Sequence, residues 1–305
     1  MSVIEQLVLG ELAKQKEERV DGFRRCSLTK ASIQKRKGIA SAGSVLGIDV
    51  GYSPTRRSSA VCRLDWDEHK IHWTIARFRA AEPERSATIA RIAGETPLAC
   101  AAFDGPLRSD LRPIGVYRIA ERMLTRGLQR TIGKPGQSSA PVGKQLNCHA
   151  NECAKAVLGL GKISLATHRT AIHAKAIVEA FPSSFLGLMI AEPQLFDAKR
   201  GNRSDIFYVH LAKTGVLTRL ISDLLPNRRL VDVFEAVTNH DDRAAVVCAL
   251  TSLCVAASRY SSVGDRQGWI ILPPRDYIQP WAWSLLVENA EITHGFVCED
   301  TQRTR

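Results

Sequence analysis

The order of strand-like and helix-like segments between residues 44 and 104 restricts this chain to few folds. Three apolar runs, joined by short polar connections, come first, at residues 44–50, 59–65 and 70–78. A helical segment that Pro83 opens and Gly94 ends separates them from a fourth run at 98–103. Short connections favour antiparallel pairing of the first three strands, whereas a helix favours a right-handed crossover to the fourth. The first and fourth strands should therefore be neighbours in one mixed sheet.

The rest of the chain continues with helices and single strands. Helical periodicity extends over residues 113–126, 144–160, 204–225 and 240–258, and further strand-like runs stand at 176–180 and 269–272. Residues 131–144 are rich in Gly, Pro and Ser and lack periodicity, which is typical of a long loop. We therefore predict an α/β fold, a ribonuclease-H-like mixed sheet flanked by helices, over residues 44–290 with the loop near 131–144 inserted. Residues 291–305 are expected to form a C-terminal tail.

The N-terminal extension, residues 1–43, is expected to be a helix followed by a basic arm. Apolar residues recur at helical spacing over residues 3–19. Residues 24–37 carry six Lys and Arg and no acid, in a chain whose formal net charge is +11. Such a segment either binds an acidic partner such as nucleic acid or is a solvated linker.

Composition excludes several classes of protein. With 45% hydrophobic and 24% charged residues, the chain is neither disordered throughout nor fibrous. It has no run of about 20 uncharged apolar residues, so no membrane span is expected, and Glu5 and Glu11 interrupt the apolar N-terminus in a way that a secretory signal does not. Several of the eight cysteines lie within apolar stretches, where reduced thiols are common. These features favour a cytoplasmic protein, and they do not fix an oligomeric state.

Three acids stand at or near the ends of apolar strand-like runs: Asp49, Asp104 and Glu179. An ionised carboxylate in such a position is desolvated at a cost of several kcal/mol unless it is paired, protonated or bound to a cation. Each acid taken alone could be a capping or strand-end residue. Their repetition favours a shared divalent cation, Mg²⁺ or Mn²⁺, because these ions take oxygen ligands.

Asp241 and Asp242 begin the apolar helical segment at 240–258. The helix dipole favours acids in a first turn, which is a sufficient structural reason for them. A helix this apolar should nevertheless lie against the sheet, where its first turn would meet the acids of the strands. We expect Asp49, Asp104 and Asp242 to bind the metal, with Asp241 as the alternative to Asp242. Asp241 and Glu179 complete a catalytic group that could use two ions about 3.5–4 Å apart.

Basic residues that follow Asp104 are candidates for binding substrate. Four arginines, at positions 118, 122, 126 and 130, step by four residues and would align on one helix face. Guanidinium groups suit phosphate oxygens, although arginines are also ordinary on solvated helices. The candidates for binding a nucleic-acid backbone are Arg108, Arg112, Arg118, Arg122, Lys134 and His240.

Five short segments carry a resemblance to a known family. They stand at residues 47–51, 103–107, 178–182, 240–251 and 268–273. In this order they resemble the bacterial domain-of-unknown-function family four-twenty-nine, over roughly residues 44–274. That family is described as predicted nucleases with a ribonuclease-H-like fold, so the resemblance implies this fold and a predicted nuclease activity. An acid is frequent in the family where Ala244 stands here.

The leading functional hypothesis is a metal-dependent nuclease that hydrolyses the phosphodiester bonds of DNA or RNA. An actin-like ATPase or sugar kinase is the alternative enzyme, because residues 47–51 would also suit a phosphate-facing strand and turn. A third hypothesis is a nucleic-acid-binding or adaptor protein without catalysis. Phosphate contacts carry no base information, so the sequence does not distinguish DNA from RNA or exo- from endonuclease action.

Overall fold

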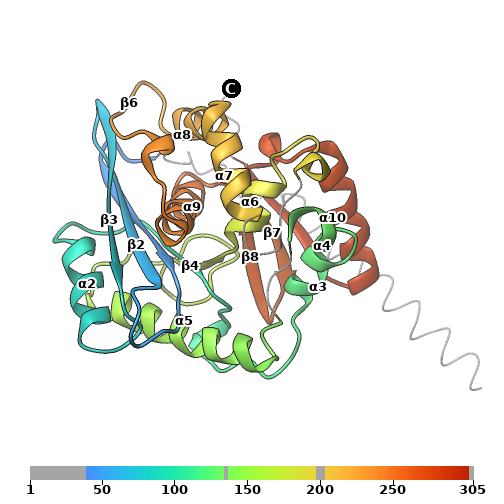
Figure 1. The fold of residues 1–305 in the computed structure, drawn as a ribbon, viewed down its shortest axis with the longest axis horizontal. Helices are drawn as coiled ribbons and strands as arrows, with labels where there is room; N and C mark the ends of the chain where they lie inside the picture. Colours follow the sequence, from blue (N-terminus) through green and yellow to red (C-terminus); the bar gives the residue numbers. More distant parts are fainter. Residues whose placement is uncertain (1–38, 134–136, 197–202, 302–305) are drawn as a thin grey trace, which may run out of the picture. The chain divides into compact units, whose positions relative to one another are not determined.

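A single mixed sheet forms the centre of the computed structural model, which describes residues 39–133, 137–196 and 203–301 (Figure 1). The sheet has nine strands in the order β6-β3-β2-β1-β4-β5-β8-β7-β9. Their bounds are β1 Gly43–Asp49, β2 Ser59–Trp66, β3 Lys70–Phe78, β4 Ala101–Asp104, β5 Ile177–Ala180, β6 Arg229–Leu230, β7 Arg259–Asp265, β8 Gly268–Leu272 and β9 Phe296–Thr301. The N-terminal helix, nearly all of the basic arm and Lys134 lie outside the described residues.

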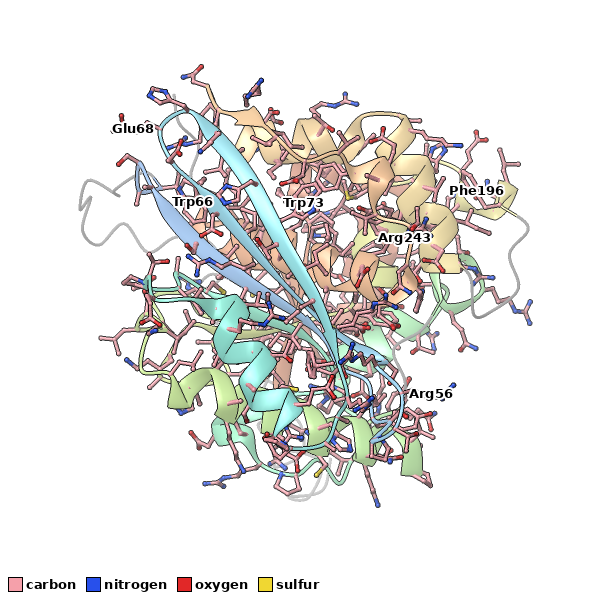
Figure 2. The ribbon with its side chains drawn as sticks, turned by 60° about the vertical axis from the view of Figure 1, so that its left-hand side comes forward. Arg56, Trp66, Glu68, Trp73, Phe196 and Arg243 are labelled. Carbon is pink, nitrogen blue, oxygen red and sulfur yellow. The ribbon has the colours of Figure 1, made fainter. Side chains whose placement is uncertain are left out.

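The pairing of the strands confirms the expected mixed α/β architecture. Strands β1, β2 and β3 form an antiparallel meander. Strands β4, β5 and β8 continue the sheet parallel to β1, and β7 and β9 add antiparallel strands at one edge. The first and fourth strands are neighbours, as the order of segments predicted. Figure 2 shows the β2–β3 hairpin with Trp66 and Trp73 along it and Glu68 at its turn.

Helices cover both faces of the sheet. Their bounds are α2 Glu84–Ala93, α3 Ile119–Thr125, α4 Gln129–Ile132, α5 Pro141–Gly159, α6 Pro182–Gly187, α7 Arg203–Lys213, α8 Val216–Leu224, α9 His240–Ala256 and α10 Pro280–Thr293, with four short 3-10 turns between them. Helices α2 and α5 share one hydrophobic core, and α9 shares the other with α6, α7 and α8 (Figure 1). None of the described helices is both long enough and apolar enough to cross a membrane.

Strand β1 is buried on both faces, which explains its nearly unbroken apolar sequence. Val45 packs in the core of α9, whereas Leu46 and Ile48 pack in the core of α2 and α5. Because side chains alternate across a strand, Gly47 and Asp49 lie on the same face as Val45. The acid at the end of β1 therefore faces the layer that contains α9.

Helix α9 lies directly on the backbone of β1. A Cβ added at Gly47 would stand 2.1 Å from the backbone nitrogen of Ala249, so only glycine allows this approach. Further along the helix, the hydroxyl of Ser252 donates a hydrogen bond of 2.7 Å to the carbonyl oxygen of Leu46. The two contacts show that α9 runs opposite to β1, which directs its first turn toward Asp49.

Two expected helices are interrupted in the structure. The segment 113–126 is helical only in α3, because Arg118 has an extended backbone with φ −72° and ψ 155°. The segment 204–225 divides into α7 and α8 at Gly215, whose φ of +70° is left-handed. Apolar residues at helical spacing continue past that glycine, so periodicity alone did not reveal the break.

The C-terminal part differs from the expected tail. Residues 296–301, which the sequence placed in the tail, form β9 and pair with β7. Strand β7 was not expected because Ser261 and Ser262 make its sequence polar, yet both serines are fully buried. Helix α5 also begins earlier than expected, at Pro141 inside the predicted loop.

The contact between Gly47 and α9 yields a prediction about stability. Gly47→Ala should lower the free energy of unfolding by about 3 kcal/mol, because the new methyl group meets helix backbone that cannot move away cheaply. Gly159→Ala is the matched control, since a Cβ there meets nothing within 4 Å. Urea unfolding of both variants checks this, and equal stabilities would contradict the close approach.

Candidate functional site

Asp49 and Asp104 lie side by side at the ends of two parallel strands. They are register partners in the β1–β4 pair, so their side chains project from the same face of the sheet. This is the face that carries α9. Each acid is the last residue of a strand whose other residues are mostly buried and apolar. The packing of these strands fixes the positions of both acids.

The two carboxylates are electrostatically unfavourable in their ionised form. Burial raises the pKa of Asp49 well above its ordinary value, and the charges of Asp104, Asp241 and Asp242 raise it further. Burial also raises the pKa of Asp104 to about 7, with Glu179 adding to the rise and His240 opposing it. Both groups keep some surface open to solvent although packed atoms surround them. Neither has a hydrogen bond or ion pair within the described residues, so the pair needs a proton or a cation.

The first turn of α9 adds two more acids. Asn239 caps the helix, and its side-chain oxygen accepts hydrogen bonds from the backbone nitrogens of Asp241 at 2.9 Å and Asp242 at 3.3 Å. The buried Oδ1 atom of Asp242 lacks a hydrogen-bond partner among the described residues, and the nearest cation, Arg77 Nε, is 3.7 Å away. Burial raises the pKa of Asp242, while Arg77 opposes the rise.

Glu179 is not part of this carboxylate group, and the structure corrects that expectation. It is the register partner of Phe103 rather than of Asp104, so it projects from the opposite face of the sheet. Its two oxygens accept hydrogen bonds of 2.7 Å from the guanidinium of Arg118, and a backbone N–H at Leu107 donates another at 2.8 Å. Glu179 is therefore a structural acid whose oxygens are already engaged.

Arg118 is likewise not a surface ligand for nucleic acid. Its side chain is 1% exposed, and it binds Glu121 at 2.8 Å as well as Glu179. The two glutamates raise the pKa of Arg118 although its burial opposes the rise, so the guanidinium stays charged. The expected stripe is not one solvated face, because Arg118 is buried whereas Arg122, one turn later in α3, is exposed, and Arg130 lies in the separate helix α4.

The remaining substrate candidates are dispersed. Arg108 is half-buried, and Arg112 is exposed with Asp110 at 3.8 Å. Arg122 is exposed and lies over the ring of Tyr117, 5.5 Å from its centroid. Within the described chain, none of these three arginines has a hydrogen bond or ion pair with Asp49, Asp104 or Asp242.

A cavity of about 470 Å³ opens beside Asp104. It is lined by Asp104, Gln129, Arg130, Gly133, Phe181, Pro182, Ser183, Arg203, Ser204, His240 and Ala244. Of the predicted substrate ligands that lie in the described residues, His240 is the one that lines the cavity with Asp104, and its Nδ1 lies 3.0 Å from Asp205. Asp205 is held in turn by Arg243, which Figure 2 labels, at 3.1 Å.

Neither Arg203 nor Phe181 stands in a sequence pattern that predicts a binding site. Arg203 begins α7 about 100 residues after Asp104, and Phe181 is the residue before α6. Arg130 belonged to the expected stripe but was assigned to its helix face rather than to a cavity. Only the fold brings these three residues together.

The carboxylates of Asp49, Asp104 and Asp242 are chemically suited to a hard divalent cation, but the three side chains are not arranged to hold one. Asp49, Asp104 and Asp242 offer only carboxylate oxygens, which Mg²⁺ and Mn²⁺ prefer, and one of those oxygens lacks a hydrogen-bond partner. Within the described parts of the chain, no three His, Cys, Asp or Glu side chains stand close enough together to hold one ion. As they stand, Asp49, Asp104 and Asp242 are therefore not close enough together to share one ion.

Compared with protein-family models, curated proteins and solved structures, the chain matches none. The resemblance to the family of predicted nucleases therefore stays a sequence-based prediction, and the functional argument depends on the site itself.

The raised pKa of Asp104 predicts a pH dependence of stability. Between about pH 4 and pH 7 the folded protein keeps a proton that the unfolded chain has released, so stability falls as the pH rises through this window. Asp104→Asn removes this loss. Without divalent cations, the variant should gain on the order of 2 kcal/mol over wild type between these pH values, a figure that allows for partial solvent access. Urea unfolding across the window checks this, and a difference that does not change with pH would contradict it.

Substitution of Glu179 should lower the stability of the protein, whereas substitution of Asp104 should raise it. Glu179→Gln removes one charge from a buried, bidentate ion pair and should lower the free energy of unfolding by about 3–5 kcal/mol. Glu95→Gln, at an ion pair whose acid is 96% exposed, is the control and should leave the urea midpoint nearly unchanged. A Glu179→Gln variant as stable as wild type would show that the pair is not structural.

Proposed function

We propose that the protein is a metal-dependent nuclease with a ribonuclease-H-like fold, hydrolysing phosphodiester bonds in DNA or RNA. The observation that carries the proposal is the register of Asp49 with Asp104 beneath the first turn of α9. Two desolvated acids that have no partner among the described residues lower stability, which is typical of groups that a protein uses for binding or catalysis. The strand order β3-β2-β1-β4-β5 supports the ribonuclease-H-like assignment.

The roles of the residues follow from their positions. Asp49, Asp104 and Asp242 are the proposed metal ligands, and Asp241 adds negative charge beside them. A bound Mg²⁺ or Mn²⁺ would supply Lewis acidity at the scissile phosphate. Near neutral pH the Asp49–Asp104 pair holds a proton, and it must release this proton to take up a cation. Substrate phosphates would lie toward the cations of the neighbouring cavity, Arg130 and Arg203.

An assay of cleavage tests this function. Labelled single-stranded DNA, duplex DNA and RNA are incubated with wild type in Mg²⁺, in Mn²⁺ and in chelator. Asp49→Asn should lower the cleavage rate by at least about 100-fold, because it removes a ligand from the cation. Asp276→Asn is the matched control, since Asp276 is 74% exposed and forms a long ion pair with Arg259, at 3.8 Å.

Four results would contradict the proposal. Cleavage that persists in chelator would exclude a divalent cation, and cleavage that Asp49→Asn leaves unchanged would exclude this site. ATP hydrolysis without cleavage of nucleic acid would favour the actin-like ATPase or sugar kinase. Binding of nucleic acid without any turnover would favour the non-catalytic protein.

A further inference from the structure

The cavity beside Asp104 collects side chains from four separate helices. Gln129 and Arg130 come from α4, and Ser183 from α6. Arg203 and Ser204 begin α7, and His240 begins α9. A cavity of about 470 Å³ is within the range of about 300–1,000 Å³ that small-molecule sites have.

Positive charge dominates the lining. Arg130 has no hydrogen bond or ion pair with any described residue, so its guanidinium is available to a ligand. Within the described residues, Arg203 donates one long hydrogen bond, from Nη1 to the carbonyl oxygen of Gln129 at 3.3 Å, and its other N–H groups have no partner there. Two guanidinium groups at one cavity suit a phosphate, because their planar N–H groups match its oxygens.

The other side of the lining suits a heterocyclic base. Phe181 is half-buried and lines the cavity, and aromatic rings are the usual surface on which an unpaired base stacks. Gln129 and Ser204 offer polar side chains for the edge of a base. The hydroxyl of Ser183 donates to the carbonyl oxygen of Ile132 at 2.6 Å, so its oxygen is left as an acceptor for the ligand.

We propose that this cavity binds one unstacked nucleotide, with its phosphate on Arg130 and Arg203 and its base against Phe181. The inference rests on the proposed function, because it places this nucleotide next to Asp104 and so next to the bond to be cleaved. A base can enter only after it leaves the stack of a duplex, so the preferred substrate is single-stranded.

Calorimetric titration in chelator tests the site without cleavage. The probes are adenosine 5′-monophosphate, adenosine and inorganic phosphate, titrated into the full chain. The monophosphate should bind more tightly than either fragment. Arg130→Gln and Arg203→Gln should each weaken it at least about tenfold, and Phe181→Leu should weaken the monophosphate without affecting phosphate. Arg91→Gln, at an exposed position in the last turn of α2, is the matched control and should bind as wild type does.

Thermal melts of the same variants show whether weaker binding comes from a lost ligand contact or from a lost fold. Arg130 is exposed, so its substitution should leave the melting temperature unchanged. Two results would overturn the proposal. If phosphate binds as well as the monophosphate and Phe181→Leu has no effect, the cavity is only an anion site. If neither arginine variant weakens the monophosphate, the nucleotide does not bind here.

The binding titration and the cleavage assay can fail independently of each other. Cleavage of nucleic acid without binding of the monophosphate would reject the nucleotide cavity alone. Binding of the monophosphate by a protein that cleaves neither DNA nor RNA would reject the nuclease and retain the nucleotide site.

Discussion

The approach of α9 to the backbone of β1 at Gly47 is the contact on which the arrangement of the site depends. With no side chain between helix and strand, the backbone of Ala249 lies against the glycine, and Ser252 is bonded to Leu46. The position and direction of the helix are thereby fixed, and its first turn comes to the end of β1. A larger residue in place of Gly47 would lift the helix and separate Asp241 and Asp242 from the acids of the strands.

The molecule buries acids in two different ways. Glu179 is fully satisfied by Arg118 and a backbone N–H, so its burial supports the packing between β5, α3 and the chain near Leu107. Asp49 and Asp104 have no such partner in the described chain, and desolvation raises the pKa of both, with the charge of Asp104 adding to the rise at Asp49 and that of Glu179 adding to the rise at Asp104. A satisfied acid contributes to the fold, whereas an unsatisfied pair lowers stability and is expected where a protein binds or reacts with something else. This contrast distinguishes the paired carboxylate of Glu179 from the proposed metal ligands.

The sequence predicted those features that depend on local pattern. Apolar runs located β1, β2 and β3, and segment order made β1 and β4 neighbours, which was enough to pair Asp49 with Asp104. Glu179 was misassigned because a strand-end acid has the same pattern whether it faces a cation or a buried arginine. The direction in which Glu179 projects depends on its register with Phe103, and Arg118 lies 61 residues away in the chain. The cavity was not predictable because Arg203 and Phe181 meet only through tertiary packing.

The central claim is that the Asp49–Asp104 pair exists to take up a divalent cation. Calorimetric titration of Mn²⁺ into wild type, in two buffers of different ionisation enthalpy, measures the protons released on binding. The account predicts release of at least about one proton per cation near pH 6 and less near pH 8, since the pKa of Asp104 is raised to about 7 and that of Asp49 is also raised. Binding with no proton release at either pH, or no binding at all, would contradict it.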